Sequence, residues 1–479
     1  MVRPEAPPVQ GLIAGRGSPA VGVIATQNPA TGEVVATYDE HDDAMVEASL
    51  GLAAEAFEDY RHSSFVDRSR WMLSAAELLE GELPDWASTI TTEMGKTFAS
   101  AKGEVAKSAR AMRYFAQHAE EMLRGRAVTT ASGTGEVCYE PIGPVLAIMP
   151  WNFPLWQVVR FAAPALMAGN VGLLKHAPNV PATALGIEGL FRRAGFPEGV
   201  FQSLLVETPR VEGLIADPRV KAVTLTGSQA AGSAVASHAG RYVKKSVLEL
   251  GGSDPFVVLA SADLGRAVSV GVEARMQNNG QSCIAAKRFV VVTDVYDAFE
   301  SAYVDAVRGL RVGDPMDPST DIGPLVSARA RDLLVSQLKD AREKGASLLV
   351  GGEAVGGAGY YFTPGVLAGV TPGMRVWHEE VFGPVALLVR AEDADEAMRI
   401  ANDSPFGLGA SVWSDDGAEQ ERFVRGLRAG MVFVNSMVSS MPELPFGGVG
   451  RSGYGRELGS EGIRELSVLK TAVRTVERG

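Results

Sequence analysis

The sequence predicts an α/β protein that combines a Rossmann-like parallel sheet, a second α/β region and a protruding β-hairpin. Short apolar strands alternate with helices from residue 145 to residue 250, and a second alternation begins near Asp254. Strands and helices of these lengths indicate βαβ units around parallel sheets that helices cover on both faces. Between residues 125 and 141, β-branched residues surround a Gly-rich centre, which is typical of a hairpin.

The elements expected in the first half follow from hydrophobic periodicity. Residues 42–122 predict several amphipathic helices, since apolar residues recur there at spacings of three and four. Apolar strands are expected after them at residues 145–150, 171–176, 221–227 and 246–250. Helices are expected between these strands at 155–169, 181–195 and 228–240, the second of them ending at Gly195.

The second half repeats this alternation. Strands are expected at residues 255–260, 287–292, 386–390, 410–414 and 431–435, and helices at 262–280, 297–312 and 395–403. Gly251-Gly252 is a plausible hinge between the two regions. The C-terminal residues 465–478 alternate weakly between apolar and polar, which favours an edge strand.

The composition excludes several classes of protein. The chain has 479 residues, 46% of them hydrophobic and 21% charged, the balance of a soluble globular protein. A net charge of −12 with no basic block argues against nucleic acid as a partner. No apolar run is long enough to predict a membrane span, and we see no secretory signal. Two cysteines cannot form a disulfide framework in a chain of this length, so a cytoplasmic location is expected.

Cys283 is the most informative candidate residue. It lies in the small polar segment Asn-Asn-Gly-Gln-Ser-Cys, between an expected helix and an expected strand. A nucleophilic thiolate needs an exposed turn, nearby N–H donors and a lowered pKa. The alternative is a buried structural cysteine, which is the commonest role of a free thiol.

Two further residues suit acyl chemistry. Glu249 lies near the end of an expected parallel strand, where a carboxylate can act as a general base on water. Asn152, in the segment PWNFP, follows a strand and can donate its amide to a developing oxyanion. The alternatives are a solvated charge for Glu249 and simple turn chemistry for Asn152.

A turn at Gly227 and Ser228 opens an expected helix, whose free N–H groups suit a pyrophosphate. It does not match the G-x-G-x-x-G fingerprint of dinucleotide sites. That fingerprint does occur at residues 448–453, but it follows no strand, so we interpret it as a chance match. No metal site is expected, because the six histidines are scattered and no cysteines have zinc spacing.

Seven segments in this order resemble the NAD(P)-dependent aldehyde dehydrogenase family over essentially the whole chain. They are PWNFP, LLKHAPN, LTGSQAAG, LELGG, GQSC, EEVFGPV and LPFGG. The resemblance implies that Cys283 is the nucleophile, Asn152 the oxyanion donor and Glu249 the general base. It also implies a set of residues that bind NAD or NADP: Trp151, Lys175, Gly227, Ser228, Glu380 and Phe382.

The resemblance further implies a division of the chain. Residues 1–124 and 142–250 would form the NAD(P)-binding domain, and residues 251–440 the catalytic domain. Residues 125–141 and 460–479 would form an oligomerisation element, and the resemblance implies a homodimer or a homotetramer.

Within this family, residues 151–160, 278–288 and 444–459 are most similar to succinate-semialdehyde dehydrogenases. The resemblance implies that Arg160 holds the carboxylate of the substrate. A buried, unpaired guanidinium in an apolar helix would be costly, and a substrate carboxylate would pair with it bidentately. The alternative is an arginine that reaches water or pairs with an internal acid.

Ser440 is a plausible second carboxylate contact, and Trp156 and Phe446 are candidate walls for the alkyl chain. Two positions depart from relatives: some relatives carry an arginine where this chain has Gln277, and close relatives often carry a basic residue where it has Glu443. Oxidation of another omega-carboxy aldehyde, or of a broad range of aldehydes, is therefore the alternative function.

The cofactor preference stays open at the sequence level. Many NAD-preferring relatives carry a glutamate where this chain has Pro178, so the group that would repel a 2′-phosphate is missing. His176 is compatible with either cofactor. Two other classes compete with aldehyde oxidation, a cofactor-free thiol hydrolase and a catalytically silent scaffold. The first has no use for Lys175 or Gly227-Ser228, and the second has none for the three catalytic candidates.

Overall fold

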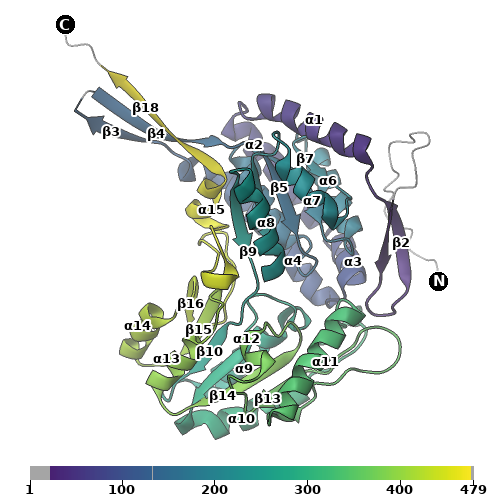
Figure 1. Cartoon of the computed structure of the whole chain (residues 1–479), viewed down its shortest axis with the longest axis vertical. Helices are drawn as coiled ribbons and strands as arrows, with labels where there is room; N and C mark the ends of the chain where they lie inside the picture. The colour runs from purple at the N-terminus through teal and green to yellow at the C-terminus, as the bar shows by residue number, and fades with distance from the viewer. Residues whose placement is uncertain (1–21, 132, 476–479) are drawn as a thin grey trace.

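Two open sheets, one above the other in Figure 1, organise the chain, and a three-stranded sheet projects from the upper part. The computed structural model describes residues 22–131 and 133–475. Both large sheets are mainly parallel and are flanked by helices, so the predicted α/β class is confirmed. The described helices include none long and apolar enough to cross a membrane.

The six-stranded sheet contains all four strands predicted between residues 145 and 250. In order across the sheet, its strands are β17 (Gly453–Tyr454), β9 (Lys245–Glu249), β8 (Ala222–Thr226), β5 (Pro144–Met149), β6 (Val171–His176) and β7 (Phe201–Ser203). All neighbours pair in parallel except β17, which is antiparallel to β9. We did not predict β7 and β17, since strands of three and two residues are too short to show periodicity.

The chain order of this sheet reverses between β5 and β8. From β5 the chain runs outward through β6 to β7 on one side, and β8 and β9 lie on the other. Open α/β sheets bind their ligands outside the carboxyl ends of the strands at such a reversal. Asn152, Ser228 and Glu249 therefore lie where a site is expected.

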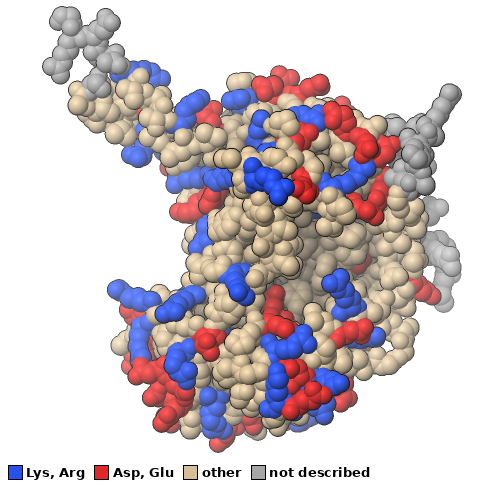
Figure 2. Space-filling model, viewed as in Figure 1, with Lys and Arg blue, Asp and Glu red and all other residues tan. Residues whose placement is uncertain are grey.

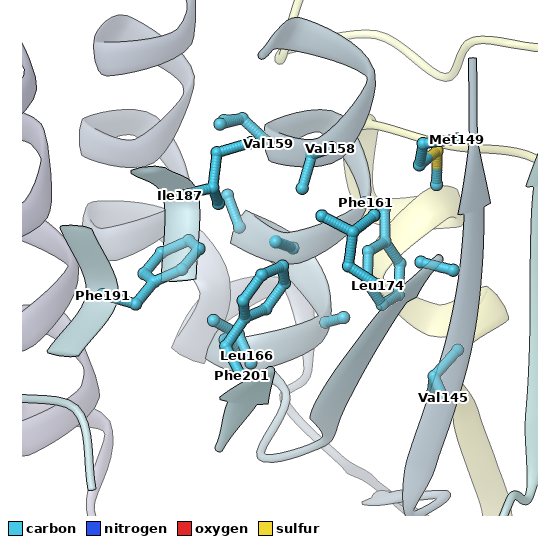
Figure 3. Close-up of a cluster of buried hydrophobic side chains, with 14 of the residues drawn as sticks. Val145, Met149, Val158, Val159, Phe161, Leu166, Leu174, Ile187, Phe191 and Phe201 are labelled. Carbon is cyan, nitrogen blue, oxygen red and sulfur yellow. The ribbon is translucent and has the colours of Figure 1, made fainter. Parts of the chain in front are cut away.

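Helices accompany this sheet. They are α1 (Asp43–Tyr60), α2 (Phe65–Gly81), α3 (Leu83–Met94), α4 (Phe98–Met122), α5 (Trp156–Met167), α6 (Pro181–Arg193), η1 (Thr208–Arg210), α7 (Val211–Ala216), α8 (Gln229–Arg241) and α15 (Gly459–Glu465). Those within residues 42–122, 155–169, 181–195 and 228–240 were predicted, whereas η1, α7 and α15 were not. Every residue of α5 is buried. Figure 3 shows its Val158 and Phe161 in one apolar cluster with Val145 of β5 and Leu174 of β6.

The seven-stranded sheet contains the five strands predicted after Asp254. In order, its strands are β12 (Ser347–Val350), β13 (Gly365–Ala368), β14 (Val385–Ala391), β11 (Arg288–Val292), β10 (Pro255–Val258), β15 (Gly409–Trp413) and β16 (Met431–Val434). Only β12, at one edge, is antiparallel to its neighbour. The helical segments of this part are α9 (Leu264–Met276), η2 (Gln277–Gly280), α10 (Thr293–Arg308), α11 (Ala328–Glu343), α12 (Arg375–His378), α13 (Ala394–Asn402) and α14 (Gly417–Gly426).

The predicted hairpin and the predicted C-terminal strand form one sheet. β3 (Arg126–Thr130) pairs with β4 (Gly133–Pro141), and β18 (Ser467–Thr475) pairs with the other side of β4, all antiparallel. This sheet projects from the body of the molecule in Figure 1. A second hairpin, β1 (Val23–Gln27) and β2 (Val34–Asp39), lies near the N-terminus.

The predicted domain boundaries stay a prediction. Strand β17 joins the six-stranded sheet although it follows the seven-stranded sheet in sequence. The short helix η3 (Gly450–Ser452) precedes it, inside the G-x-G-x-x-G match. A Cβ on Gly453 would lie 1.9 Å from the carbonyl oxygen of Leu248, so this glycine is needed for the close approach of β17 to β9.

Candidate active site

The carboxyl ends of the six-stranded sheet and the amino ends of the seven-stranded sheet meet around Cys283. Asn152 follows β5, and its Nδ2 donates to the main-chain oxygen of Gln281 over 3.1 Å. Glu249 ends β9, and the N–H of nearby Gly252 donates to Oε1 of Glu380 over 3.2 Å. Figure 2 shows the face hollowed between the two parts, with mostly uncharged residues around the hollow.

The loop before Cys283 is held in an unusual backbone conformation. Asn278 and Asn279 have φ values of 55° and 58°, the left-handed region that asparagine tolerates better than most residues. Nδ2 of Asn278 donates to the main-chain oxygens of Asn152 (2.8 Å) and Gln281 (2.9 Å). Sequence reasoning missed that the Asn278 side chain holds this loop, although the Asn-Asn-Gly run is itself typical of left-handed turns.

Lys287, directly before β11, also holds this loop in place. Its side chain is fully buried, and its Nζ donates to the main-chain oxygen of Ser282 over 2.8 Å and to that of Cys283. It also forms an ion pair with Glu380, with 3.3 Å between Nζ and Oε1. Within the described chain the N–H of Cys283 donates to no acceptor, so it is free to serve a ligand.

The expectation of a lowered thiol pKa at Cys283 is wrong for the free protein. Burial raises the pKa of this thiol to about 11, although the positive charges of Arg160 and Lys287 oppose the shift. The side chain is nonetheless partly accessible. At neutral pH the group is therefore a thiol, and its use as a nucleophile requires a base.

Glu249 has the properties of such a base. It is 2% exposed, and neither carboxylate oxygen has a hydrogen-bond partner among the described residues. Burial raises its pKa well above the usual range, helped by Glu457 and opposed by Arg160 and Arg456. A buried carboxylate without partners is costly, so such a group points to a function for its oxygens.

The premise that Arg160 is unpaired is wrong. The residue is 1% exposed and forms an ion pair with Glu457, which is the internal-acid alternative. Its Nη2 also donates to Oγ1 of Thr226 over 3.2 Å, and its guanidinium lies 4.4 Å from the ring centre of Phe446. Glu457 is far from Arg160 in sequence, so no local sequence pattern predicts this ion pair.

Trp156 and Ser440 come together through a residue that sequence reasoning missed. Nζ of Lys107, on α4, donates to Oγ of Ser440 over 2.6 Å and lies 4.4 Å from the ring centre of Trp156. The loop that carries Ser440 is also tied to α4 by an ion pair between Arg110 and Glu443. The acidic residue at 443 thus has a partner in the chain itself.

As expected, the turn after β8 opens a helix. Ser228 is the N-cap of α8, and its Oγ accepts the N–H of Ala231 over 3.3 Å. The N–H of Gly227 donates to the main-chain oxygen of Glu249 over 2.9 Å, which links this turn to β9. The N-terminus of a helix of 13 residues, opening toward the site, fits a pyrophosphate.

The other cofactor candidates fit the remaining parts of a dinucleotide. Lys175 is the penultimate residue of β6 and is 6% exposed. It has no carboxylate within ion-pair distance among the described residues, so it can take a ribose or phosphate oxygen. Burial lowers its pKa, and Glu40 raises it. Trp151 and Phe382 meet edge to face at 5.8 Å, an apolar pair suited to a flat ring.

Known proteins of one family resemble this chain throughout. Residues 18–472 match the profile of the aldehyde dehydrogenase family. Succinate-semialdehyde dehydrogenase [NADP(+)] of Mycolicibacterium paratuberculosis is 54% identical over 94% of this chain and 96% of its own. Succinate-semialdehyde dehydrogenase [NADP(+)] 1 of Mycobacterium tuberculosis is 52% identical over 94% of this chain and 99% of its own.

Among solved structures, succinic semialdehyde dehydrogenase from Streptococcus pyogenes, in complex with NADP+ as the cofactor, superposes with a TM-score of 0.93. It is 36% identical, and the match covers 95% of this chain and 100% of that one. The chain belongs to the aldehyde dehydrogenase family.

Two buried charged residues hold the start of helix α5, directly after the PWNFP segment of this aldehyde dehydrogenase. Oε1 of Glu104 accepts the N–H groups of Leu155 and Trp156, each over 2.9 Å, and so caps α5 from the neighbouring helix α4. Glu104 is in turn paired with Lys96. Sequence reasoning missed both residues, because a cap supplied by another helix leaves no local signal.

His176 also serves the fold of this aldehyde dehydrogenase. It is buried, and its Nε2 lies 2.8 Å from the main-chain oxygen of Pro154, while Ala177 donates to its Nδ1 over 2.9 Å. Burial lowers its pKa to about 4, so the ring is neutral and Nε2–H donates to Pro154. Among the described residues, no cluster of His, Cys, Asp or Glu is arranged to hold a metal ion.

Proposed function

We propose that this aldehyde dehydrogenase oxidises succinate semialdehyde to succinate with NAD+ or NADP+. The single observation that carries the mechanism is the buried carboxylate of Glu249, which has no hydrogen-bond partner among the described residues and ends strand β9. The relatives that are 52–54% identical support the choice of substrate. Oxidation of another omega-carboxy aldehyde, or of a broad range of aldehydes, is the alternative.

In the first step Glu249 accepts the proton of the Cys283 thiol, which burial keeps protonated at neutral pH. The thiolate adds to the aldehyde carbon and forms a thiohemiacetal. The negative charge that develops on the former carbonyl oxygen is stabilised by Nδ2 of Asn152 and the N–H of Cys283. The rigid support from Asn278 and Lys287 keeps these donors in place.

A bound nicotinamide cofactor would supply the hydride acceptor that converts the thiohemiacetal into a thioester on Cys283. Glu249 first releases the thiol proton to solvent. It then takes a proton from a water molecule, which attacks the thioester, releases the acid and frees the Cys283 thiolate. The residues proposed to bind the cofactor are Trp151, Lys175, Gly227, Ser228, Glu380 and Phe382. Pro178 carries no carboxylate to repel a 2′-phosphate, which supports use of NADP+ as well as NAD+.

For the substrate, we propose that Trp156 and Phe446 line the alkyl chain and that Ser440 contacts the distal carboxylate. Arg160 contributes positive charge near the site, but Glu457 already neutralises it. We therefore assign Arg160 no direct contact with the substrate carboxylate.

The test follows reduced nicotinamide by absorbance, with succinate semialdehyde and with butanal, each in the presence of NAD+ and of NADP+. The expected result is a kcat/KM for succinate semialdehyde well above that for butanal. No cofactor reduction with either aldehyde would contradict the proposed reaction, and equal efficiency with both would contradict only the proposed substrate.

We also propose that copies of the chain pair through the projecting sheet to form a homodimer or a homotetramer in the cytoplasm. Val468, Leu469 and Val473 of β18 are 45%, 61% and 53% exposed, which leaves an apolar strand uncovered at the edge of the sheet. The molar mass in solution, measured by light scattering, tests this proposal, and a monomer would contradict it.

A further inference from the structure

We infer that Lys107 is the cation that binds the distal carboxylate of the substrate, and thereby sets the preference for an omega-carboxylated aldehyde. This inference rests on the proposed function and names the charged residue of its substrate pocket. The preference requires a positive charge near the far end of a short alkyl chain whose aldehyde lies at Cys283. Lys107 meets this requirement better than Arg160 does.

The first argument is the direct environment of Lys107. Its Nζ lies 4.4 Å from the ring centre of Trp156 and 2.6 Å from Oγ of Ser440. An ammonium has three N–H groups, so donation to Ser440 leaves it able to donate to a further acceptor. The Ser440 hydroxyl, having accepted from Lys107, keeps its own proton to donate to the same carboxylate. The Trp156 ring beside two donors, the Lys107 ammonium and the Ser440 hydroxyl, suits a carboxylate on a short alkyl chain.

The second argument compares the buried cations of this region. Arg160 is paired with Glu457, Lys287 with Glu380, and Lys96 with Glu104. Lys107 differs from them, because no described carboxylate lies within 4.0 Å of its Nζ. A largely buried ammonium without a counterion is unfavourable, so an anionic ligand gains most at this position.

The third argument is the location of Lys107 relative to the nucleophile. An ionised Cys283 would raise the pKa of Lys107, so the two groups are within electrostatic range of each other. Burial is the main influence and lowers the pKa of Lys107 to about 8, with Arg160 and Arg110 acting in the same direction and Glu104 against them. The side chain is thus protonated at neutral pH, and a bound carboxylate would stabilise that form.

The test replaces Lys107 with methionine, which keeps the length of the side chain and removes its charge. The ratio of kcat/KM for succinate semialdehyde to that for butanal should fall about tenfold or more, mainly through KM, as expected for the loss of one charge-assisted hydrogen bond. Inhibition by the product supplies an independent measurement. Succinate should bind the variant more weakly by a similar factor, whereas the affinity of butyrate, which lacks the second carboxylate, should change less.

Two further variants control this experiment. Lys102→Met removes an exposed lysine from the same helix, and it should leave the ratio unchanged. Lys107→Arg keeps the charge and should restore part of the preference. If Lys107→Met does not fold, Lys107→Gln takes its place.

Three outcomes would overturn the inference. Equal losses with both aldehydes would indicate a structural role for Lys107, and an unchanged ratio would assign the carboxylate to another residue. In both cases the wild type could still prefer succinate semialdehyde, so the proposed function would stand. A wild type without that preference would overturn the proposed substrate together with the inference.

Discussion

The two large sheets contribute to the candidate active site from opposite ends of their strands. In the six-stranded sheet the contributing residues lie at or just after the carboxyl ends: Asn152 after β5, Lys175 on β6, Ser228 after β8 and Glu249 on β9. In the seven-stranded sheet they precede the amino ends: Asp254 before β10, Cys283 and Lys287 before β11, and Glu380 before β14.

The difference explains which chemistry each sheet supplies. Beyond the carboxyl ends the chain turns into helix N-termini, so this edge offers N–H groups to phosphates and oxyanions. At the amino ends, carbonyl groups of the incoming loop face inward, and a buried cation has to satisfy them. Lys287 does this for Ser282 and Cys283. We therefore expect the first edge to bind anions and the second to hold Cys283, the proposed nucleophile.

The largest effect should come from removing the nucleophile at the amino-end edge. Cys283→Ala should lower kcat by about three orders of magnitude or more, because the remaining donors cannot form a thioester. Cys138→Ala is the matched control, since this second free cysteine lies on β4 and should leave kcat unchanged. Activity that survives in Cys283→Ala would contradict the assignment of Cys283 as the nucleophile.

The next largest effect should come from the carboxyl-end edge. Glu249→Gln should lower kcat about 10²- to 10⁴-fold, the usual contribution of a general base. Because burial raises the pKa of Glu249, wild-type kcat should increase with pH as this group loses its proton. The pH profile of kcat tests this, and an identical rising limb in Glu249→Gln would assign the base elsewhere.

Asp254, before β10, should make the stability of the protein depend on pH. Burial raises the pKa of this carboxyl from 3.8 to about 7, so between these values the folded state holds a proton that the unfolded state has released. Its contribution is therefore lost as pH rises, by about 3 kcal/mol between pH 5 and 8. Urea unfolding at pH 5 and at pH 8 should show that the free energy of unfolding of the wild type falls with pH relative to that of Asp254→Asn. A constant difference between the two proteins would contradict the prediction.

His176, at the other edge, should show the opposite slope and a smaller effect. Burial lowers its pKa from 6.5 to about 4, so between these values only the unfolded state binds the proton. Its contribution is present at neutral pH and is lost on acidification, by about 2 kcal/mol between pH 7 and 5. His176→Gln, which can still donate to Pro154, should lack this loss. The same urea series measures it, and parallel pH curves would argue against the assignment.

Much of the fold was predictable from periodicity and turn chemistry. The strands of four residues or more around Cys283 and Glu249 are apolar, and the Ser228 cap and the 125–141 hairpin have local signatures. The strands β7 and β17 were not predictable, since so few residues carry no periodic signal. The catalytic candidates stood out because the family motifs are local stretches of sequence.

The supporting residues were not predictable for a physical reason. Glu104 caps a helix to which it does not belong, and Glu457 neutralises an arginine in a distant segment. Lys107 is one more lysine on an amphipathic helix until the loop at Ser440 folds against it. A sequence pattern records what each residue does to its own segment, and these three act on other segments.

From the sequence alone one obtains the α/β class, the order of most strands and helices, and the candidate residues Asn152, Glu249 and Cys283. Folding sets their ionisation and their partners. Burial raises the thiol pKa of Cys283, leaves Glu249 without a hydrogen bond and pairs Arg160 with Glu457. Desolvation and charge pairing depend on groups brought together from distant parts of the chain, so they follow from the tertiary structure and not from local sequence.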